Sequence, residues 1–141
     1  MVNTHYEKMV DNLGETLIPP TLKEFAHTFS DDLSSSLGLD IPVTTSHFAA
    51  NNSIFMTIGN GSWVDAAGRP TSEGYTIDVT ASGIVITGAS PLGAWWATRT
   101  IMQQGVLNDL ELDFGTATDS PGWGIRGIFV SFPLSMSYEL R

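Results

Sequence analysis

The 141-residue chain suits one domain, and its 42% hydrophobic and 15% charged residues are typical of a globular protein. Its formal net charge of −9 and its six Lys and Arg residues argue against a nucleic-acid partner, because phosphates need clustered basic side chains. No apolar run approaches the roughly 20 residues that cross a bilayer, and the lack of cysteine excludes disulfides, thiolate nucleophiles and zinc–thiolate sites.

The beginning of the chain carries no clear structural pattern. Residues 1–17 have weak hydrophobic periodicity, and we expect them to form an arm or a frayed segment. They lack the apolar core of a secretory signal peptide, so no signal peptide is visible. Two glycosylation sequons, Asn51-Asn52-Ser53 and Asn60-Gly61-Ser62, do not establish secretion, because such triplets often arise by chance in loops rich in Asn and Ser.

An amphipathic helix is predicted from Leu22 to Leu37. Thr21 and Glu24 match a capping box, in which each side chain accepts a hydrogen bond from the backbone N–H of the other residue. Gly38 is suited to end the helix, because glycine adopts the left-handed conformation without steric cost. Apolar residues recur at helical spacing along one face, at Leu22, Phe25, Ala26, Phe29 and Leu33.

The central part of the chain predicts strands. Ile41-Pro42-Val43 suits a short edge strand, because proline cannot donate a ladder hydrogen bond, and Ser53–Ile58 has the composition of a buried strand. Tyr75–Thr80 alternates apolar and polar residues, the period-2 pattern of a half-buried strand. A short turn ending in Gly83 leads to a second β-branched run, Ile84–Ile86, so a hairpin is expected.

A second helix is expected to begin at Ser90-Pro91, where serine caps the first turn and proline loses no hydrogen bond. Its packed face is predicted to carry Leu92, Trp95, Trp96, Arg99, Met102 and Val106. Leu110–Thr118 is ambiguous, and Ile125–Phe132 indicates a final strand that Arg126 interrupts. The resulting order predicts an α+β fold in which two helices pack on a mainly antiparallel sheet.

The sequence shows no recognisable catalytic cluster. His5, His27 and His47 stand far apart without the spacing of metal ligands, so we expect no bound metal and no cofactor. No Gly-x-Ser-x-Gly elbow and no phosphate-binding glycine loop occurs. The carboxylates of Asp31-Asp32 point in different directions on the first helix, which favours solvated charge over a catalytic pair.

Three tryptophans and two arginines are the remaining candidates. Trp95 and Trp96 could stack on a sugar ring, but their amphipathic helix favours a place in the core or in a domain interface, and Trp123 is similar. Arg99 lies on an otherwise apolar face, which indicates an ion pair or a contact with another domain. Arg126 is either a surface arginine on an edge strand or a fork for a hydroxyl or carboxylate ligand.

Several stretches carry a resemblance to a known family. Glu73–Thr87 and Gly93–Gln104 resemble, in order and spacing, the non-catalytic N-terminal domain of family 20 glycoside hydrolases, the β-N-acetylhexosaminidases. Asp119–Gly127 looks like the family's crossing from that domain into its catalytic barrel, and Pro20–Gly38 is similar to the family's first helix. The resemblance covers roughly Ile18 to Val130.

The resemblance implies a zincin-like α+β fold without zinc, which buttresses a (β/α)8 barrel. In that barrel an Asp-Glu pair assists attack by the substrate's own acetamido group. One site residue carries over: Arg126 matches the arginine at the start of the first barrel strand, which binds hydroxyls of the terminal sugar. No Asp-Glu pair carries over, and Ser131 stands where the family tends to have an aspartate, so the tail looks truncated or altered.

We therefore expect an N-terminal arm at 1–17, an α+β accessory domain at 18–118, and a linker with a remnant of the first barrel strand at 119–141. This accessory domain of a β-N-acetylhexosaminidase would be inactive alone. Its partners would be the catalytic barrel of the parent chain and, through that parent, glycans containing N-acetylhexosamine, with no nucleic acid and no membrane. The family's proteins are often secreted or lysosomal. Two alternatives stay open: a free-standing carbohydrate-binding or protein-interaction module, and an independent enzyme of unknown type.

Overall fold

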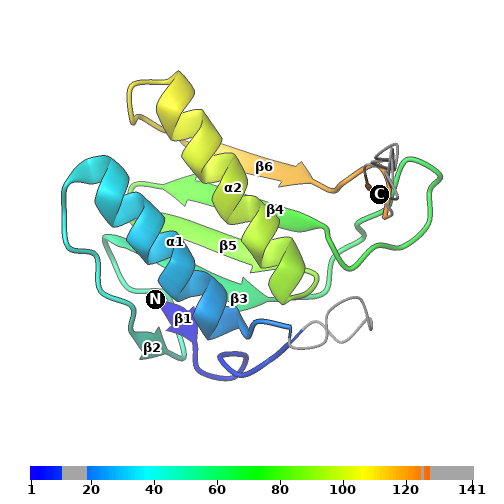
Figure 1. Cartoon of the computed structure of the whole chain (residues 1–141), viewed down its shortest axis with the longest axis horizontal. Coiled ribbons are helices and arrows are strands. Elements are labelled where there is room, and N and C mark those ends of the chain that lie inside the picture. Colours follow the sequence, from blue (N-terminus) through cyan, green and yellow to red (C-terminus); the bar gives the residue numbers. More distant parts are fainter. Residues whose placement is uncertain (11–18, 125, 128–141) are drawn as a thin grey trace, which may run out of the picture.

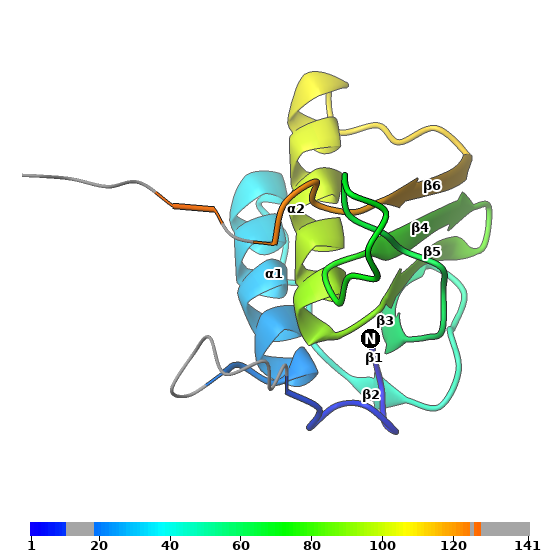
Figure 2. The ribbon, with the colours of Figure 1, turned by 90° about the vertical axis from the view of Figure 1, so that its right-hand side faces the viewer.

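The computed structural model describes residues 1–10, 19–124 and 126–127. In these residues two helices lie side by side over one face of a six-stranded sheet (Figures 1 and 2). The elements are β1 (Val2–Asn3), α1 (Leu22–Leu37), β2 (Thr45–Ser46), β3 (Ser53–Ile58), β4 (Tyr75–Thr80), β5 (Gly83–Gly88), α2 (Pro91–Leu107) and β6 (Gly115–Asp119). Neither helix in the described part of the chain combines the length and the apolarity that a membrane span requires.

The sheet is mixed, so the expectation of a mainly antiparallel sheet is wrong. Its strand order is β2-β1-β3-β5-β4-β6. β1 is parallel to β2 and β3, and β3 is parallel to β5, whereas β4 is antiparallel to both β5 and β6. The hydrophobic pattern of a strand predicts that it is buried, but it does not predict which strand lies next to it. Here the long connection over residues 59–74 separates β3 from β4, and β5 lies between these two strands in the sheet. The two-layer α+β architecture is confirmed, and its zincin-like character stays a prediction.

The predicted first helix is confirmed as α1, with both of its caps. Glu24 N–H donates to Thr21 Oγ1 at 3.1 Å, and Thr21 N–H donates to the Glu24 carboxylate at 2.7 Å. The Thr21 backbone N–H, followed by its hydroxyl, holds the pKa of Glu24 below its ordinary value, because both donors favour the ionised form. Gly38 ends α1 with φ +66°, the left-handed conformation that glycine adopts without strain.

Helix α2 begins where the sequence predicts, but it packs through a different face. Ser90 Oγ accepts hydrogen bonds from the backbone N–H groups of Leu92 at 3.1 Å and Gly93 at 3.3 Å. The buried face consists of small side chains, whereas Val106, expected on the packed face, is 74% exposed. Small residues let the helix approach the sheet closely, while Trp95 stacks on Phe25 of α1 and Trp96 is turned toward Glu73. The buried residues of α2 are Pro91, Gly93, Ala94, Ala97, Thr98 and Ile101.

The hydrophobic core lies between the helices and the sheet. Ile77 and Ile86 are paired across the β4–β5 hairpin, and Met56 is paired with Ile86 from β3. Each is at most 4% exposed, and full burial of such a side chain stabilises the fold by roughly 1.5–3 kcal/mol. On the opposite face Thr116 Oγ1 donates to Asp78 at 2.6 Å, whereas Phe55 is paired with Val85, so that face carries both polar and apolar residues.

The first residues of the expected arm at 1–17 are part of the sheet, and residues 11–17 lie outside the described residues. Val2 is fully buried in β1, which lies between β2 and β3. Val2 N–H donates to Thr44 O at 2.8 Å, and Met56 N–H donates to Met1 O at 2.9 Å. A two-residue strand is too short to produce hydrophobic periodicity, and for this reason the sequence did not predict it.

Two further strand predictions need correction. Ile41-Pro42-Val43 lies outside any strand, and β2 follows it at Thr45–Ser46. The ambiguous stretch Leu110–Thr118 contains most of β6, which begins only at Gly115. The strand expected at Ile125–Phe132 falls largely outside the described residues; Arg126 and Gly127 are described and lie in no helix or strand.

The phenol of Tyr75 joins β4, α2 and β6. Its oxygen lies 2.6 Å from Thr100 Oγ1, and its O–H donates to Asp119 Oδ2 at 3.3 Å. Burial raises the pKa of Tyr75 above its ordinary value, and the Asp119 carboxylate adds to this increase, whereas the hydrogen bond with Thr100 opposes it.

We expect the domain to lose stability as the pH rises above about 10. The Tyr75 phenol ionises more readily in the unfolded chain than in the fold, so its contribution is complete below its unfolded pKa and disappears as the pH rises through its folded pKa. Urea unfolding of the natural chain and of Tyr75→Phe, between about pH 8 and 11, measures this contribution. The variant should lose less stability across that window, and equal losses would contradict the assignment.

Candidate functional site

A buried carboxylate, that of Glu73, marks the candidate site. Glu73 lies two residues before the first residue of β4, and its side chain is only 8% exposed. Its backbone N–H donates to Thr71 Oγ1 at 3.2 Å, while Ala89 N–H donates to Gly74 O at 2.8 Å. Because Gly93 has no side chain, the first turn of α2 lies against the backbone of residues 72–74. The backbone on which Glu73 sits is therefore held by both the hairpin and the helix.

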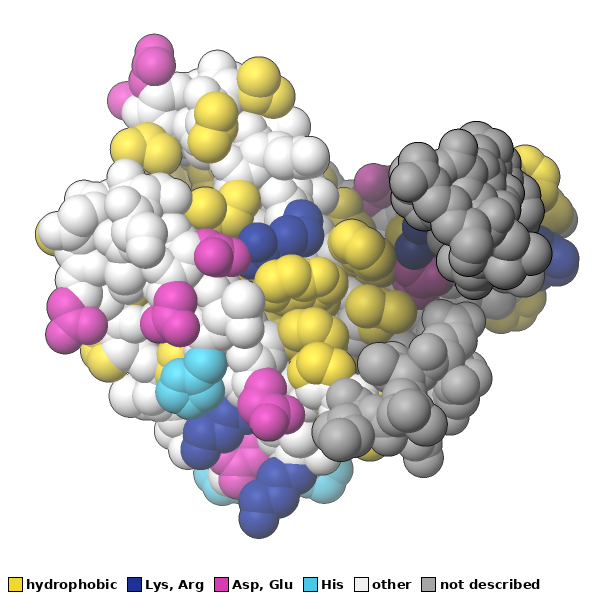
Figure 3. All heavy atoms as spheres, in the orientation of Figure 1, with side chains coloured by type: hydrophobic (Ala, Val, Ile, Leu, Met, Phe, Trp, Pro, Cys, Tyr) yellow, Lys and Arg dark blue, Asp and Glu magenta, His cyan; other side chains and the backbone are white. Residues whose placement is uncertain are grey.

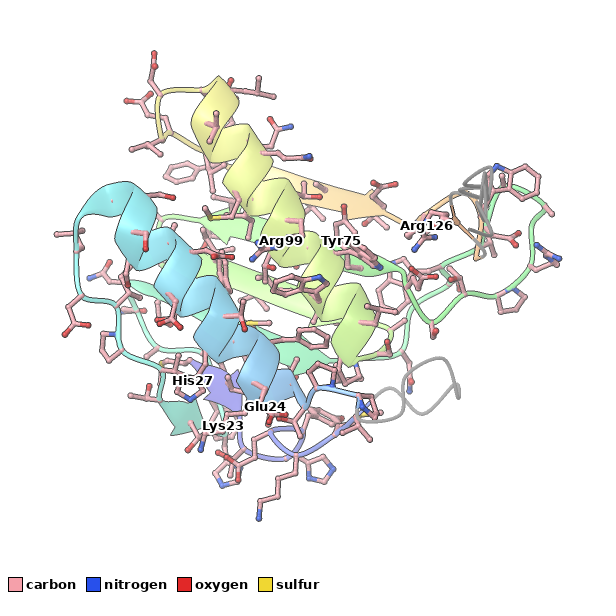
Figure 4. The ribbon with its side chains drawn as sticks, in the orientation of Figure 1. Lys23, Glu24, His27, Tyr75, Arg99 and Arg126 are labelled. Carbon is pink, nitrogen blue, oxygen red and sulfur yellow. The ribbon has the colours of Figure 1, made fainter. Side chains whose placement is uncertain are left out.

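Two donors converge on the Glu73 carboxylate. Trp96 Nε1–H, from α2, donates to Oε2 at 2.7 Å, and Arg126 Nη2 donates to the same oxygen. The guanidinium carbon of Arg126 lies 5.4 Å from the centre of the Trp96 ring, and Arg126 Nη1 donates to the backbone oxygen of Trp123. Figure 4 shows Arg126 beyond the end of β6, at the end of the sheet where β4 begins with Tyr75. We call these four residues the Glu73 cluster.

A second group of side chains lies on the outer face of the helices, which we call the outer helix face. Phe25 of α1 stacks on Trp95 of α2, with ring centres 5.0 Å apart and planes inclined by 24°. Arg99 lies over the Trp95 ring at 3.8 Å and forms an ion pair with Asp32 Oδ2 at 2.7 Å. Arg99 Nη2 is buried and has no acceptor among the described residues. In Figures 3 and 4 apolar side chains gather over the two helices, and Arg99 lies between them.

The sequence candidates thus fall into two places. Arg126, Trp96 and Trp123 come together in the Glu73 cluster, while Trp95 and Arg99 belong to the outer helix face. The ion pair expected for Arg99 is confirmed, and its partner is Asp32, whose side chain is 40% exposed. Trp95 and Trp96 are half-buried in contacts within the chain, whereas Trp123 is 62% exposed.

Glu73 itself was missed by the sequence analysis as a site residue. Its three neighbours in the cluster lie 23 to 53 residues further along the chain, and no local pattern indicates such a convergence. The one local indication is an acidic residue two positions before the buried start of β4, and it does not indicate which side chains contact that residue.

The described residues offer little to a metal ion or to a reaction. No group of three or more His, Asp and Glu side chains among them could hold a metal. His5, His27 and His47 are exposed, and they stand 20 or more residues apart along the chain. Neither the Glu73 cluster nor the outer helix face, both built from described residues, contains a hydroxyl or thiol nucleophile beside a base.

These features define an α+β domain with a partly buried Arg–Glu pair at one end of its sheet and an aromatic cluster on its helices. A family model described as glycosyl hydrolase family 20, domain 2, matches residues 15–118, and the chain therefore belongs to this family. A search of curated proteins gives no match.

The chain is also similar to solved structures of Streptomyces plicatus enzymes. One is a mutant beta-hexosaminidase in complex with the product GlcNAc, with 21% identity and a TM-score of 0.46. Another is the N-acetyl-beta-hexosaminidase in complex with Thio-NAglucal, with 19% identity and a TM-score of 0.45. Both comparisons cover 85% of this chain and 21% of the enzyme, so the chain spans about a fifth of the length of these enzymes.

Proposed function

We propose that this chain is the accessory domain of a β-N-acetylhexosaminidase, an enzyme that hydrolyses terminal N-acetylhexosamine residues. The observation that carries the proposal is the match of residues 15–118 to domain 2 of the family. In this proposal the domain spans 18–118, residues 119–141 lead toward a catalytic (β/α)8 barrel, and the chemistry belongs to that barrel. The domain alone is inactive.

The outer helix face is the surface on which the barrel docks. The Arg99 guanidinium lies over the Trp95 ring on this face, and 29% of its side chain is exposed. Next to it a shallow cavity of about 350 Å³ is lined by Phe25, Trp95 and two prolines together with Glu24 and Thr28. A second domain that covers this face can bury the apolar surface and contact the exposed part of the Arg99 side chain.

Arg126 contributes to binding of the terminal sugar. Its side chain is 44% exposed although it is paired with Glu73, so part of the guanidinium faces solvent. A guanidinium is a planar fork of N–H donors, which suits neighbouring hydroxyl groups of a sugar ring. In this role Arg126 binds substrate and takes no part in proton transfer.

We expect the purified 141-residue chain to release no product from an aryl N-acetylglucosaminide above an enzyme-free blank. Glycosidases need an acid and a nucleophile or base placed around the scissile bond, and the accessory domain lacks them. Release of the aryl alcohol is measured at a concentration at which even a turnover of about 1 per second would be obvious. Turnover that follows the folded chain through purification would contradict the assignment of the chemistry to a separate barrel.

The natural transcript supplies the complementary test. If it continues into a barrel with adjacent Asp and Glu, the longer protein should turn over the same substrate. If the coding sequence stops at Arg141, the alternative of a free-standing carbohydrate-binding or protein-interaction module gains weight. The exposed indole of Trp123 is the feature of the structure that favours this alternative.

A further inference from the structure

The position of the Glu73 carboxylate is set by contacts that do not involve Arg126. Its backbone lies in the tight contact between residues 72–74 and the first turn of α2, where the nearest approach to Gly93 leaves no room for a side chain. The Trp96 indole comes from the next turn of the same helix and donates to the carboxylate at 2.7 Å. Both parts of this pair belong to regular structure or lie directly beside it, so their relative position is fixed by the fold.

Arg126, in contrast, lies in no helix or strand and depends on the contacts of its side chain. The carboxylate of Glu73 and the backbone oxygen of Trp123 take two of its five N–H donors. The Trp96 ring supports the guanidinium from one side at 5.4 Å. The remaining three donors have no partner among the described residues, and 44% of the side chain is open to solvent.

We propose that Glu73 is a positioning residue for Arg126: with Trp96 it holds the guanidinium on the accessory domain, so that the free N–H donors of Arg126 point toward a sugar hydroxyl. The ligand in this statement rests on the proposed function, whereas the anchoring of Arg126 rests on the contacts of the cluster. In this proposal the accessory domain helps to position a sugar-binding residue, in addition to packing against the barrel.

The Asp65–Arg69 ion pair illustrates why Glu73 needs a cation. Asp65 also accepts backbone N–H bonds from Ala67 at 2.9 Å and Arg69 at 3.0 Å, so its carboxylate keeps donors if the arginine side chain leaves. If Arg126 leaves, the Glu73 carboxylate keeps a single donor among the described residues, the Trp96 indole. A buried carboxylate with one neutral donor is poorly compensated, so the cluster favours the state in which Arg126 is bound.

Nuclear magnetic resonance of the ¹⁵N-labelled 141-residue chain tests the anchoring. The Trp96 indole N–H should exchange with solvent roughly tenfold or more slowly than that of Trp123, because it donates to a buried carboxylate. Glu73→Gln should remove most of this protection and shift the Arg126 Nε–H signal to that of a free arginine. Asp32→Asn is the matched control, since it removes the carboxylate from the other guanidinium pair and should leave both signals unchanged.

Arg126→Gln tests the direction of the dependence, because it removes the cation but keeps a side-chain amide N–H that can still donate to Glu73. The Trp96 indole should keep its slow exchange in this variant, within a factor of about two. An increase as large as that in Glu73→Gln would show that Arg126 holds Glu73 in place, and it would overturn the proposal. If Glu73→Gln is unfolded by circular dichroism, the outcome with Arg126→Gln still decides.

Titration with N-acetylglucosamine separates the anchoring from the sugar role. In the natural chain the Arg126 Nε–H signal should shift with added sugar, and in Glu73→Gln the shift should be weaker or lost. If the anchoring is found but the sugar shifts no Arg126 signal, the sugar role of Arg126 is overturned and the anchor stands. If only the Trp123 indole responds, and equally in Glu73→Gln, positioning is overturned and a free-standing binding module is favoured.

Discussion

Replacing Gly93 with alanine is expected to destabilise the domain by about 3 kcal/mol or more, although it adds a single methyl group. A Cβ at this position would lie 2.4 Å from Gly74 O and 3.1 Å from Ser72 O. These are backbone atoms, and Gly74 O already accepts the hydrogen bond of Ala89 N–H, so they cannot rotate away as a side chain would. The first turn of α2 would have to move off the hairpin.

Gly105→Ala is the matched control for this prediction, because it makes the same change in the same helix. The nearest atom to a Cβ at Gly105 is in the Leu110 side chain at 3.7 Å, an ordinary contact. Alanine is the better helix former, so this variant should gain about 0.5 kcal/mol. Urea unfolding followed by circular dichroism measures both changes. A Gly93→Ala variant as stable as the natural chain would mean that α2 does not rest on residues 72–74.

Ile86→Ala is expected to cost about 2–5 kcal/mol, the usual range for emptying a fully buried aliphatic site. Ile86 has no exposed surface and is paired with Ile77 on one side and with Met56 on the other. Helix α2 packs against the same part of the sheet, so the cavity would be enclosed on several sides by elements that cannot all relax into it.

The neighbouring Val85 provides the control, because successive side chains of a strand point to opposite faces of the sheet. Val85 is half-buried on the face away from the helices, and Val85→Ala should cost about 1 kcal/mol. The two variants are compared by the urea concentration at the midpoint of unfolding. A similar loss for both would contradict the assignment of the core to the helix side of the sheet.

The elements with local causes could be predicted from the sequence. The bounds of α1 follow from Thr21 and Glu24 at one end and Gly38 at the other, and all three act within a few residues. The β4–β5 hairpin likewise follows from alternation and a short turn. The order of the strands in the sheet could not be predicted. A parallel pair such as β3–β5 is joined by a long connection, and no local sequence pattern in it indicates which two strands will pair.

The packed face of α2 shows a different limit. Large side chains such as Trp95 and Met102 dominate a hydrophobic pattern, but a close approach of helix and sheet is decided by small residues such as Gly93 and Ala97. The candidate site has the same difficulty, because the role of Glu73 depends on its contacts with Trp96 and Arg126, which belong to distant segments of the chain. The sequence identifies Arg126 as a candidate but not the carboxylate that holds it.

The place of β1 has a consequence for self-association. This strand has only two residues, yet it fills the gap between β2 and β3, and β2 has no other neighbour in the described sheet. If Val2 and Asn3 leave this position, the parallel edge of β3 loses its cover, and unpaired N–H and C=O groups become available to another molecule. Strand exchange between chains would then begin at β3, so the pairing of this two-residue strand keeps the edge of β3 closed to another chain.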